Sequence, residues 1–474
     1  MLSVWAAVSF ATLDWYSEIC LLSGLGLCLA ALVLMTYRIM RRCSLLSDPI
    51  YVTVVSYMLF IGVGPVLAFS GLPLGSQADR SVHLKTLGIS WIGATSLLLG
   101  YTMSRLNARS ARAPSMFSLE RQFDNTTPRS NLILKHFGLG YTAIGLAGVV
   151  VYLNHVGGLT QLVQTTYFQR EAAHLSTGLS YEALRPGVVL LIAWTVGQRH
   201  SSTIWQAALA TSILFDMAWF GPIRGSRNQE FTLLLTVYFL FTSGGGARSA
   251  KLTTSALMVA GVLTMLVWGA ERGTKPVAQM SSGGADLVGE VAGALYAPFD
   301  ILNKIIWTVP GELPYLKGAS LIEAVTIWIP RTCWAGKPRG LGWDLNDIYY
   351  GTIRGGNSVP TWPGELYWDF GIIGVIAGMF MMGVVCARLA RLNRPYIVGR
   401  GFPVTRTLYA VSYPIFLVWV WAGSSEAMWY LLENILPVYV ACRIAMRPVS
   451  IGCTRSLLSS GVTGLTEQDN NTRI

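Results

Sequence analysis

The chain has 474 residues, of which 52% are hydrophobic and only 12% are charged. Its mean hydropathy is +0.48. This balance excludes a large soluble protein and predicts an integral membrane protein.

About eleven apolar segments predict helices that cross a hydrocarbon core of about 30 Å. Because backbone groups in lipid must form hydrogen bonds within their own segment, we expect helices and not strands. The predicted fold is therefore all-α, a polytopic membrane helix bundle. The segments lie near residues 17–37, 49–70, 85–104, 136–154, 183–198, 203–221, 229–243, 252–270, 366–387, 407–423 and 427–442.

Basic residues decide the expected orientation, because Lys and Arg stay on the inner side of short loops. Most of the 35 Lys and Arg residues fall in alternate gaps when the N-terminus is placed outside. The N-terminus is therefore expected outside and the C-terminus inside. The net charge of +11 follows from this topology and suits an anionic inner leaflet, so nucleic acid is not an expected partner.

The segments divide the chain into four parts. Residues 1–270 hold eight predicted spans, 271–365 form a large outer loop, 366–455 hold three spans, and 456–474 form a polar tail that is expected to be disordered. In the large loop, 284–309 and 319–330 have the spacing of amphipathic helices that lie on the membrane or close over the bundle. Residues 336–364, rich in Gly, Pro, Asn and Asp, are expected to be irregular.

Cations on the outer side depart from the positive-inside tendency and suggest binding of an anion. A guanidinium group presents a planar fork of donors that matches phosphate oxygens. The alternative is that each cation snorkels or pairs with a neighbouring acid. The cations considered for phosphate binding are Arg170, Arg224, Arg227, Arg331, Lys337, Arg339 and Arg354.

Tryptophans and acids add further candidates. Trp343 and Trp362 lie in the irregular part of the loop, where their rings could stack on sugars or anchor the chain at the interface. Glu365 and Asp369 are four residues apart and share a face of a helix, which suits a proton acceptor. Alternatively, Glu365 pairs with Arg331 and only holds the loop in place.

His174, four residues after Arg170, is a weaker candidate base. No acidic or cysteine cluster with metal-ligand spacing appears on the outer side. We therefore expect neither a metal nor a cofactor.

The order of motifs over residues 329–374 resembles the O-antigen or oligosaccharide repeat-unit polymerase family (Wzy-type). The motifs are IPR, then Trp and GKP, Gly-rich turns, SVP, and GELYWDFGIIG at the start of a span. The GSR element at 225–227 and the loop around Arg170 support the resemblance.

The resemblance implies a multi-spanning glycosyltransferase on the outer face of the bacterial inner membrane. It would move a glycan from undecaprenyl diphosphate to a sugar hydroxyl of a second lipid-linked repeat unit, without a nucleotide sugar. The outer cations, Arg331 included, would neutralise the diphosphate, and Glu365, or less favourably Asp369 or His174, would accept the proton. A chain-length regulator and a flippase are candidate partners.

Two other functions remain open. An O-antigen ligase has a similar topology and uses a similar donor. The residues by which ligases are recognised include a histidine in the large outer loop, where this chain has none. A polysaccharide or lipid transporter is expected to concentrate ionisable residues at mid-membrane. Here Asp216 and Glu426 lie in or near the spans, but the charge is concentrated on the outer side, which favours chemistry at the interface.

Overall fold

The computed structural model gives an all-helical arrangement in the part of the chain that it describes, and no strand occurs there. This confirms the all-α prediction. The described residues are 19, 21–30, 33, 48–68, 80–110, 128–164, 180–197, 203–219, 227–242, 287–329, 333–350, 359–392 and 403–445.

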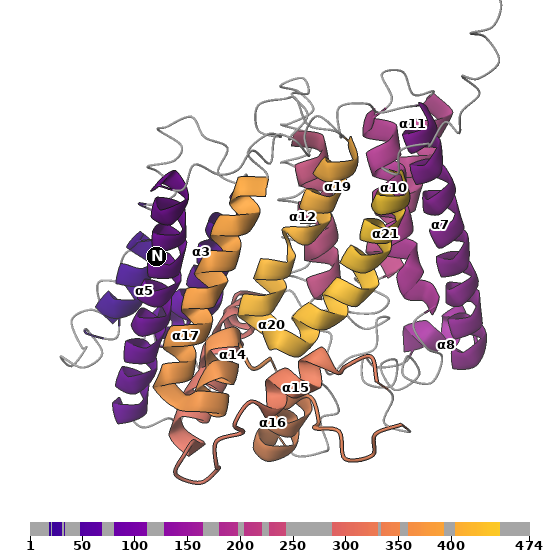
Figure 1. Cartoon of the computed structure of the whole chain (residues 1–474). Helices are drawn as coiled ribbons and strands as arrows, with labels where there is room; N and C mark the ends of the chain where they lie inside the picture. The colour runs from indigo at the N-terminus through magenta and orange to yellow at the C-terminus, as the bar shows by residue number, and fades with distance from the viewer. Residues whose placement is uncertain are drawn as a thin grey trace, which may run out of the picture.

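Most of the helices run side by side as a bundle (Figure 1). In chain order they are α3 (Pro49–Tyr57), η2 (Met58–Gly62), α4 (Val63–Ala68), α5 (Arg80–Ser110), α7 (Pro128–Val156), α8 (Leu159–Gln164), η3 (Ser180–Ala183), α10 (Leu184–Gly197), α11 (Thr203–Ala218), α12 (Arg227–Thr242), α14 (Leu287–Thr308), α15 (Ala319–Val325), α16 (Leu341–Tyr350), α17 (Trp362–Leu392), α19 (Pro403–Ser412), α20 (Ile415–Tyr430), η8 (Leu431–Ile435) and α21 (Leu436–Ala445).

Five helical stretches of the described residues are long and apolar enough to cross a membrane. They overlap six of the predicted spans, because the last stretch covers 427–442 and the second part of 407–423. By the length and composition of these helices the chain is a membrane protein. The stretches are Pro49–Leu67, Ser81–Asn107, Asn131–Val156, Trp362–Ala390 and Ile415–Ala445.

The other predicted spans have shorter helices or lie outside the described residues. Helices α10, α11 and α12 coincide with three of them but have 14, 16 and 16 residues. The first is described mainly at Leu21–Ala30, an apolar helix, and 252–270 lies outside the described residues. The total of eleven spans and their orientation therefore stay predictions.

The last stretch is broken at Gly423, whose φ of +84° is not helical. Figure 1 shows α19 and the first part of α20 leading towards α15, and η8 and α21 leading away again, so that the two arms form a V. Across the V the Tyr430 hydroxyl donates to the Val411 carbonyl oxygen at 3.0 Å. The two predicted spans 407–423 and 427–442 correspond to these arms.

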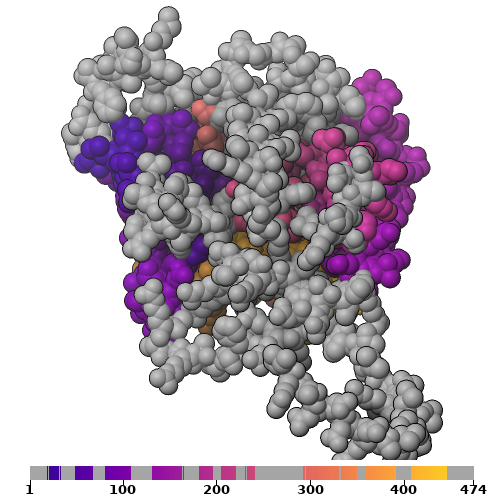
Figure 2. All heavy atoms as spheres, turned by 90° about the horizontal axis from the view of Figure 1, so that it is seen from above, coloured from indigo at the N-terminus to yellow at the C-terminus, as the bar shows by residue number. Residues whose placement is uncertain are grey.

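Two apolar cores hold the bundle together. One joins α3, α5, α14, α17 and α20, and the other joins α7, α10, α12, α19 and α21. Seen from the end opposite to α15, the N-terminal helices and the α7–α11 group lie on opposite sides, with C-terminal helices between them (Figure 2). The C-terminal helices therefore contribute to both cores.

Glycines bring α5 and α17 into close contact. A Cβ atom on Gly100 would lie 2.1 Å from the Phe380 carbonyl oxygen, and one on Gly383 would lie 2.1 Å from the Leu97 carbonyl oxygen. Small residues at such crossings allow backbones to approach closely, which is the usual basis of helix packing in a bilayer.

At the end of the bundle away from α15, a polar cluster ties the helix ends together. The Asp48 carboxyl group accepts a hydrogen bond from Ile50 N at 3.3 Å as the cap of α3. The same carboxyl group accepts from the Tyr101 hydroxyl, and Arg105 lies 3.4 Å from it. The start of α3 and the end of α5 therefore lie at one side of the bundle, as antiparallel neighbouring spans require.

The described part of the predicted outer loop is largely helical. Helix α14 coincides with the predicted amphipathic helix at 284–309. Its residues Phe299, Leu302 and Ile306 are buried against the bundle. Of the two expected placements, this burial favours a helix that closes over the bundle and not one that lies on the membrane surface. The expectation of irregular structure across 336–364 is wrong for residues 341–350 and 362–364, which are helical. Leu341 and Leu345 of α16 pack on Ile301 of α14 and its neighbours, and this i, i+4 contact stabilises a helix despite the Gly and Asn content.

Candidate functional site

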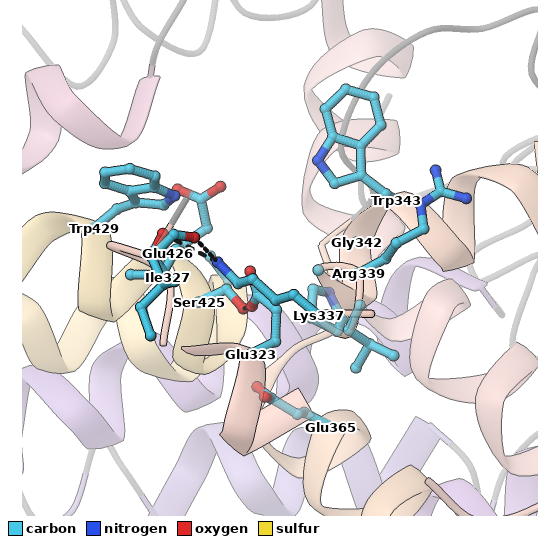
Figure 3. A pocket seen from close by; sticks show the side chains of 15 residues that line it. Glu323, Ile327, Lys337, Arg339, Gly342, Trp343, Glu365, Ser425, Glu426 and Trp429 are labelled. Carbon is cyan, nitrogen blue, oxygen red and sulfur yellow. Dashed lines mark hydrogen bonds between the residues drawn. The ribbon is translucent and has the colours of Figure 1, made fainter. Parts of the chain in front are cut away.

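A cavity of about 400 Å³ lies where α15 and α16 meet the ends of α17 and α20 (Figure 3). Four of the predicted site residues line it, namely Lys337, Arg339, Trp343 and Glu365. They come from the segment before α16, from α16 itself and from the first turn of α17. Residues that are far apart in the sequence therefore line the same cavity.

Glu365 forms a junction between three helices. Its Oε1 accepts a hydrogen bond from the Ser320 hydroxyl of α15 at 2.8 Å, and its Oε2 accepts one from Ser424 N of α20 at 2.6 Å. The Ser424 hydroxyl also donates to Oε1. The residue is 1% exposed, so its carboxyl group is held mainly by protein donors.

Asp369, one turn after Glu365, uses the same serine. Its Oδ1 accepts from Gly318 N at 3.1 Å, and its Oδ2 lies 2.5 Å from the Ser320 hydroxyl. A hydroxyl group carries one hydrogen, so Ser320 can donate to only one carboxyl group at a time. Ser320 therefore lies between the two acids and links α15 to the start of α17.

Two glycines explain how the chain reaches this geometry. Gly371 has a φ of +66°, and after it a Cβ atom on Gly374 would lie 2.4 Å from the Leu366 carbonyl oxygen. The short helix that carries Glu365 and Asp369 thus turns back onto the spanning part of α17. The GELYWDFGIIG motif therefore specifies two anchoring acids, a turn and a close contact.

The cations of the cavity have acceptors within the protein. Lys337 Nζ donates to the carbonyl oxygens of Ile327 at 3.1 Å and Ile329 at 3.3 Å, and so it satisfies carbonyl groups after the end of α15 (Figure 3). Arg339 donates to Asp347 at 2.8 Å and lies 3.7 Å from Asp344. These contacts favour structural roles for the two cations.

The two predicted tryptophans differ. Trp343 is partly exposed on the lining. Trp362 is buried in the core, where its ring centroid lies 5.3 Å from that of Trp419, and it does not line the cavity. This placement favours packing over sugar stacking for Trp362.

The remaining predicted site residues contribute nothing to the described geometry. Arg227 is the first residue of α12, and its side chain is not described. The others lie outside the described residues and are Arg170, His174, Arg224, Arg331 and Arg354.

Sequence reasoning missed a whole wall of the cavity. Glu323 of α15 and Ser425, Glu426 and Trp429 of α20 line it, and the Ser425 hydroxyl donates to Glu323. The spacing of Ser425, Glu426 and Trp429 puts them on one helical face. That spacing was available in the sequence, but nothing there indicated which helix they face.

Comparisons with protein-family models, with curated proteins and with solved structures found no match.

Within the described residues, no group of three or more His, Cys, Asp and Glu side chains could hold a metal ion. The described lining instead offers three glutamates, Glu323, Glu365 and Glu426, with two indole rings, those of Trp343 and Trp429. Carboxylates accept hydrogen bonds from hydroxyl groups, and indole rings pack on apolar C–H faces. A ligand that is rich in hydroxyl groups and has flat C–H faces fits both.

Proposed function

We propose that the chain is a membrane glycosyltransferase that joins undecaprenyl-diphosphate-linked oligosaccharide repeat units. It would act at the outer face of the bacterial inner membrane and release undecaprenyl diphosphate, as a polymerase of O-antigen or exopolysaccharide does. The observation that carries this proposal is the cavity of carboxylates and tryptophans at one end of a bundle of membrane-spanning helices. Lys337, residues 339–343 and Glu365, within the stretch that resembles Wzy-type polymerases, line that cavity.

The chemistry needs few protein groups, because the lipid diphosphate is already an activated leaving group. The protein must bind the two glycans, orient a hydroxyl group and accept its proton. Carboxylates and indole rings suit these tasks, and we propose no metal and no cofactor. Arg170, Arg224, Arg227, Arg331 and Arg354 remain the proposed diphosphate ligands.

The test is reconstitution of the purified protein in liposomes with lipid-linked repeat units. We expect a ladder of lipid-linked glycans that differ by one repeat. Transfer only to a lipid A core would support the ligase alternative, and movement of the substrate across the bilayer without a new glycosidic bond would support the transporter. Absence of any ladder with active substrates would contradict the polymerase proposal.

A pair of glycine substitutions connects the ladder to the cavity. A Cβ atom on Gly340 would lie 3.5 Å from Trp343 and 3.7 Å from Glu323, so a leucine there can be accommodated but fills the cavity. A Cβ atom on exposed Gly336 would approach only Trp334, at 3.8 Å. We expect Gly340→Leu to abolish laddering and Gly336→Leu to retain it, and equal ladders would contradict a role for this cavity.

One observation favours transport as a second candidate. Arg185 and Asp216 are both buried, with Arg185 Nε 3.7 Å from Asp216 Oδ2, and Glu230 is buried on neighbouring α12. Ionisable groups inside a membrane bundle often mark a translocation path. This alternative would be favoured if the wild type makes no ladder but moves the substrate across the bilayer, and if liposomes that contain the Asp216→Asn variant lose that movement.

A further inference from the structure

The three glutamates on the cavity differ in how fully the protein encloses them. Glu365 is 1% exposed, and both of its carboxyl oxygens accept hydrogen bonds from serines. Glu323 is 6% exposed and accepts from the Ser425 hydroxyl. Glu426 is partly exposed on the lining. A proton acceptor must come within about 3 Å of the reacting hydroxyl group, and Glu426 is the most accessible of the three.

The break at Gly423 determines which residues of α20 face the cavity. Ser424 donates to Glu365, whereas Ser425, Glu426 and Trp429 line the cavity. Figure 3 shows Glu426 beside Trp429 on one side of the cavity, with Trp343 and Arg339 on the other. A sugar between the two indoles would thus have the Glu426 carboxyl group beside it.

The charge of the described lining favours a sugar over a diphosphate at this position. Lys337 is hydrogen bonded to two carbonyl oxygens, and Arg339 pairs with Asp347 and lies near Asp344. Carboxylates accept from sugar hydroxyl groups but repel phosphate oxygens. The cavity therefore suits the end of a glycan that presents free hydroxyl groups.

We propose that the cavity holds the acceptor sugar, that Glu426 is the catalytic base, and that Glu365 is a positioning residue. This inference rests on the proposed function. The acceptor hydroxyl oxygen attacks C1 of the donor sugar, and a glycosidic C–O bond forms as the C1–O bond to the diphosphate breaks. The lipid diphosphate leaves with the bonding electron pair, and the hydroxyl proton moves to Glu426 and then to water.

The test compares Glu426→Gln and Glu365→Gln in liposomes with lipid-linked repeat units, over a range of pH. Glu426→Gln should lower kcat by about 10² to 10⁴-fold, leave the KM of the acceptor little changed, and remove the acid limb of the pH–rate profile. Glu365→Gln should retain that limb, because Glu426 is intact, and so are the other charged groups that line the cavity, Glu323, Lys337 and Arg339. Glu426→Asp should restore part of kcat and the limb, and the exposed Glu312→Gln serves as control.

The outcomes separate the inference from the proposed function. If the wild type makes no ladder, the proposed function fails. If the wild type makes a ladder and Glu426→Gln keeps wild-type kcat, or Glu365→Gln removes the acid limb, the assignment to Glu426 is wrong and the function stands. A second measurement uses the wild-type protein without substitutions. A water-soluble carbodiimide should modify the Glu426 carboxyl group, and bound acceptor should prevent this modification. Modification that the acceptor does not reduce would also overturn the assignment.

Discussion

Replacing Glu365 with alanine is expected to destabilise the end of the bundle by about 3 kcal/mol or more, because it leaves several buried donors without an acceptor. Ser424 N and the hydroxyl groups of Ser320 and Ser424 all donate to this carboxyl group. Each buried donor that loses its partner costs about 1–3 kcal/mol. Thermal unfolding of the purified protein in detergent should show a clearly lower Tm.

Glutamine at the same position should cost much less, about 1 kcal/mol. Its amide oxygen can accept from Ser424 N, and its amide nitrogen can donate to the serine oxygens once the hydroxyl groups rotate. The exposed Glu312→Ala serves as the matched control and should leave Tm unchanged. If Glu365→Ala unfolds at the wild-type temperature, the hydrogen bonds to Ser320 and Ser424 do not hold the junction.

Replacing Gly423 with alanine should have an effect of similar size. Gly423 has a φ of +84° and a ψ of −171°, a backbone region that costs a residue with a Cβ atom about 1–3 kcal/mol, and the Cβ atom would lie 2.5 Å from Glu365 Oε2. The clash would push α20 away from α17 and shift the wall that carries Glu426 and Trp429. We expect a loss of about 3 kcal/mol in stability and loss of laddering.

The control for Gly423→Ala is Gly88→Ala in α5, where an added Cβ atom meets nothing within 4 Å. Alanine favours a helix over glycine by about 1 kcal/mol, so this variant should be as stable as the wild type or slightly more stable. If the Gly423 and Gly88 variants behave alike, the chain does not reverse at Gly423 in the way described.

The spans were predicted best where long apolar runs stand alone. The expected segment near 136–154 is a helix at Asn131–Val156, and the one near 85–104 is Ser81–Asn107. The helix α16 was missed, because its glycine and polar residues indicate a loop by composition. Leu341 and Leu345 stabilise the helix by packing on α14, a contact that the sequence does not reveal.

The site could be predicted only in part, since its contacts join distant segments. The i, i+4 spacing of Glu365 and Asp369 correctly indicated one shared face, and both contact Ser320. Ser320 and Ser424 lie 45 and 59 residues away from Glu365, so no local pattern reveals them. The same limit applies to Lys337 and Arg339, because the sequence shows the cations but not which protein oxygens they meet.

The most direct test of sugar binding in the cavity is photo-crosslinking of the wild-type protein in liposomes to a lipid-linked repeat unit that carries a diazirine on its terminal sugar. We expect labelled peptides from the cavity wall, containing Trp343 of α16 or Glu426 and Trp429 of α20, and competition by unlabelled acceptor. Labels confined to other parts of the chain, with none on these two helices in the presence of competent substrate, would contradict a sugar-binding role for the cavity.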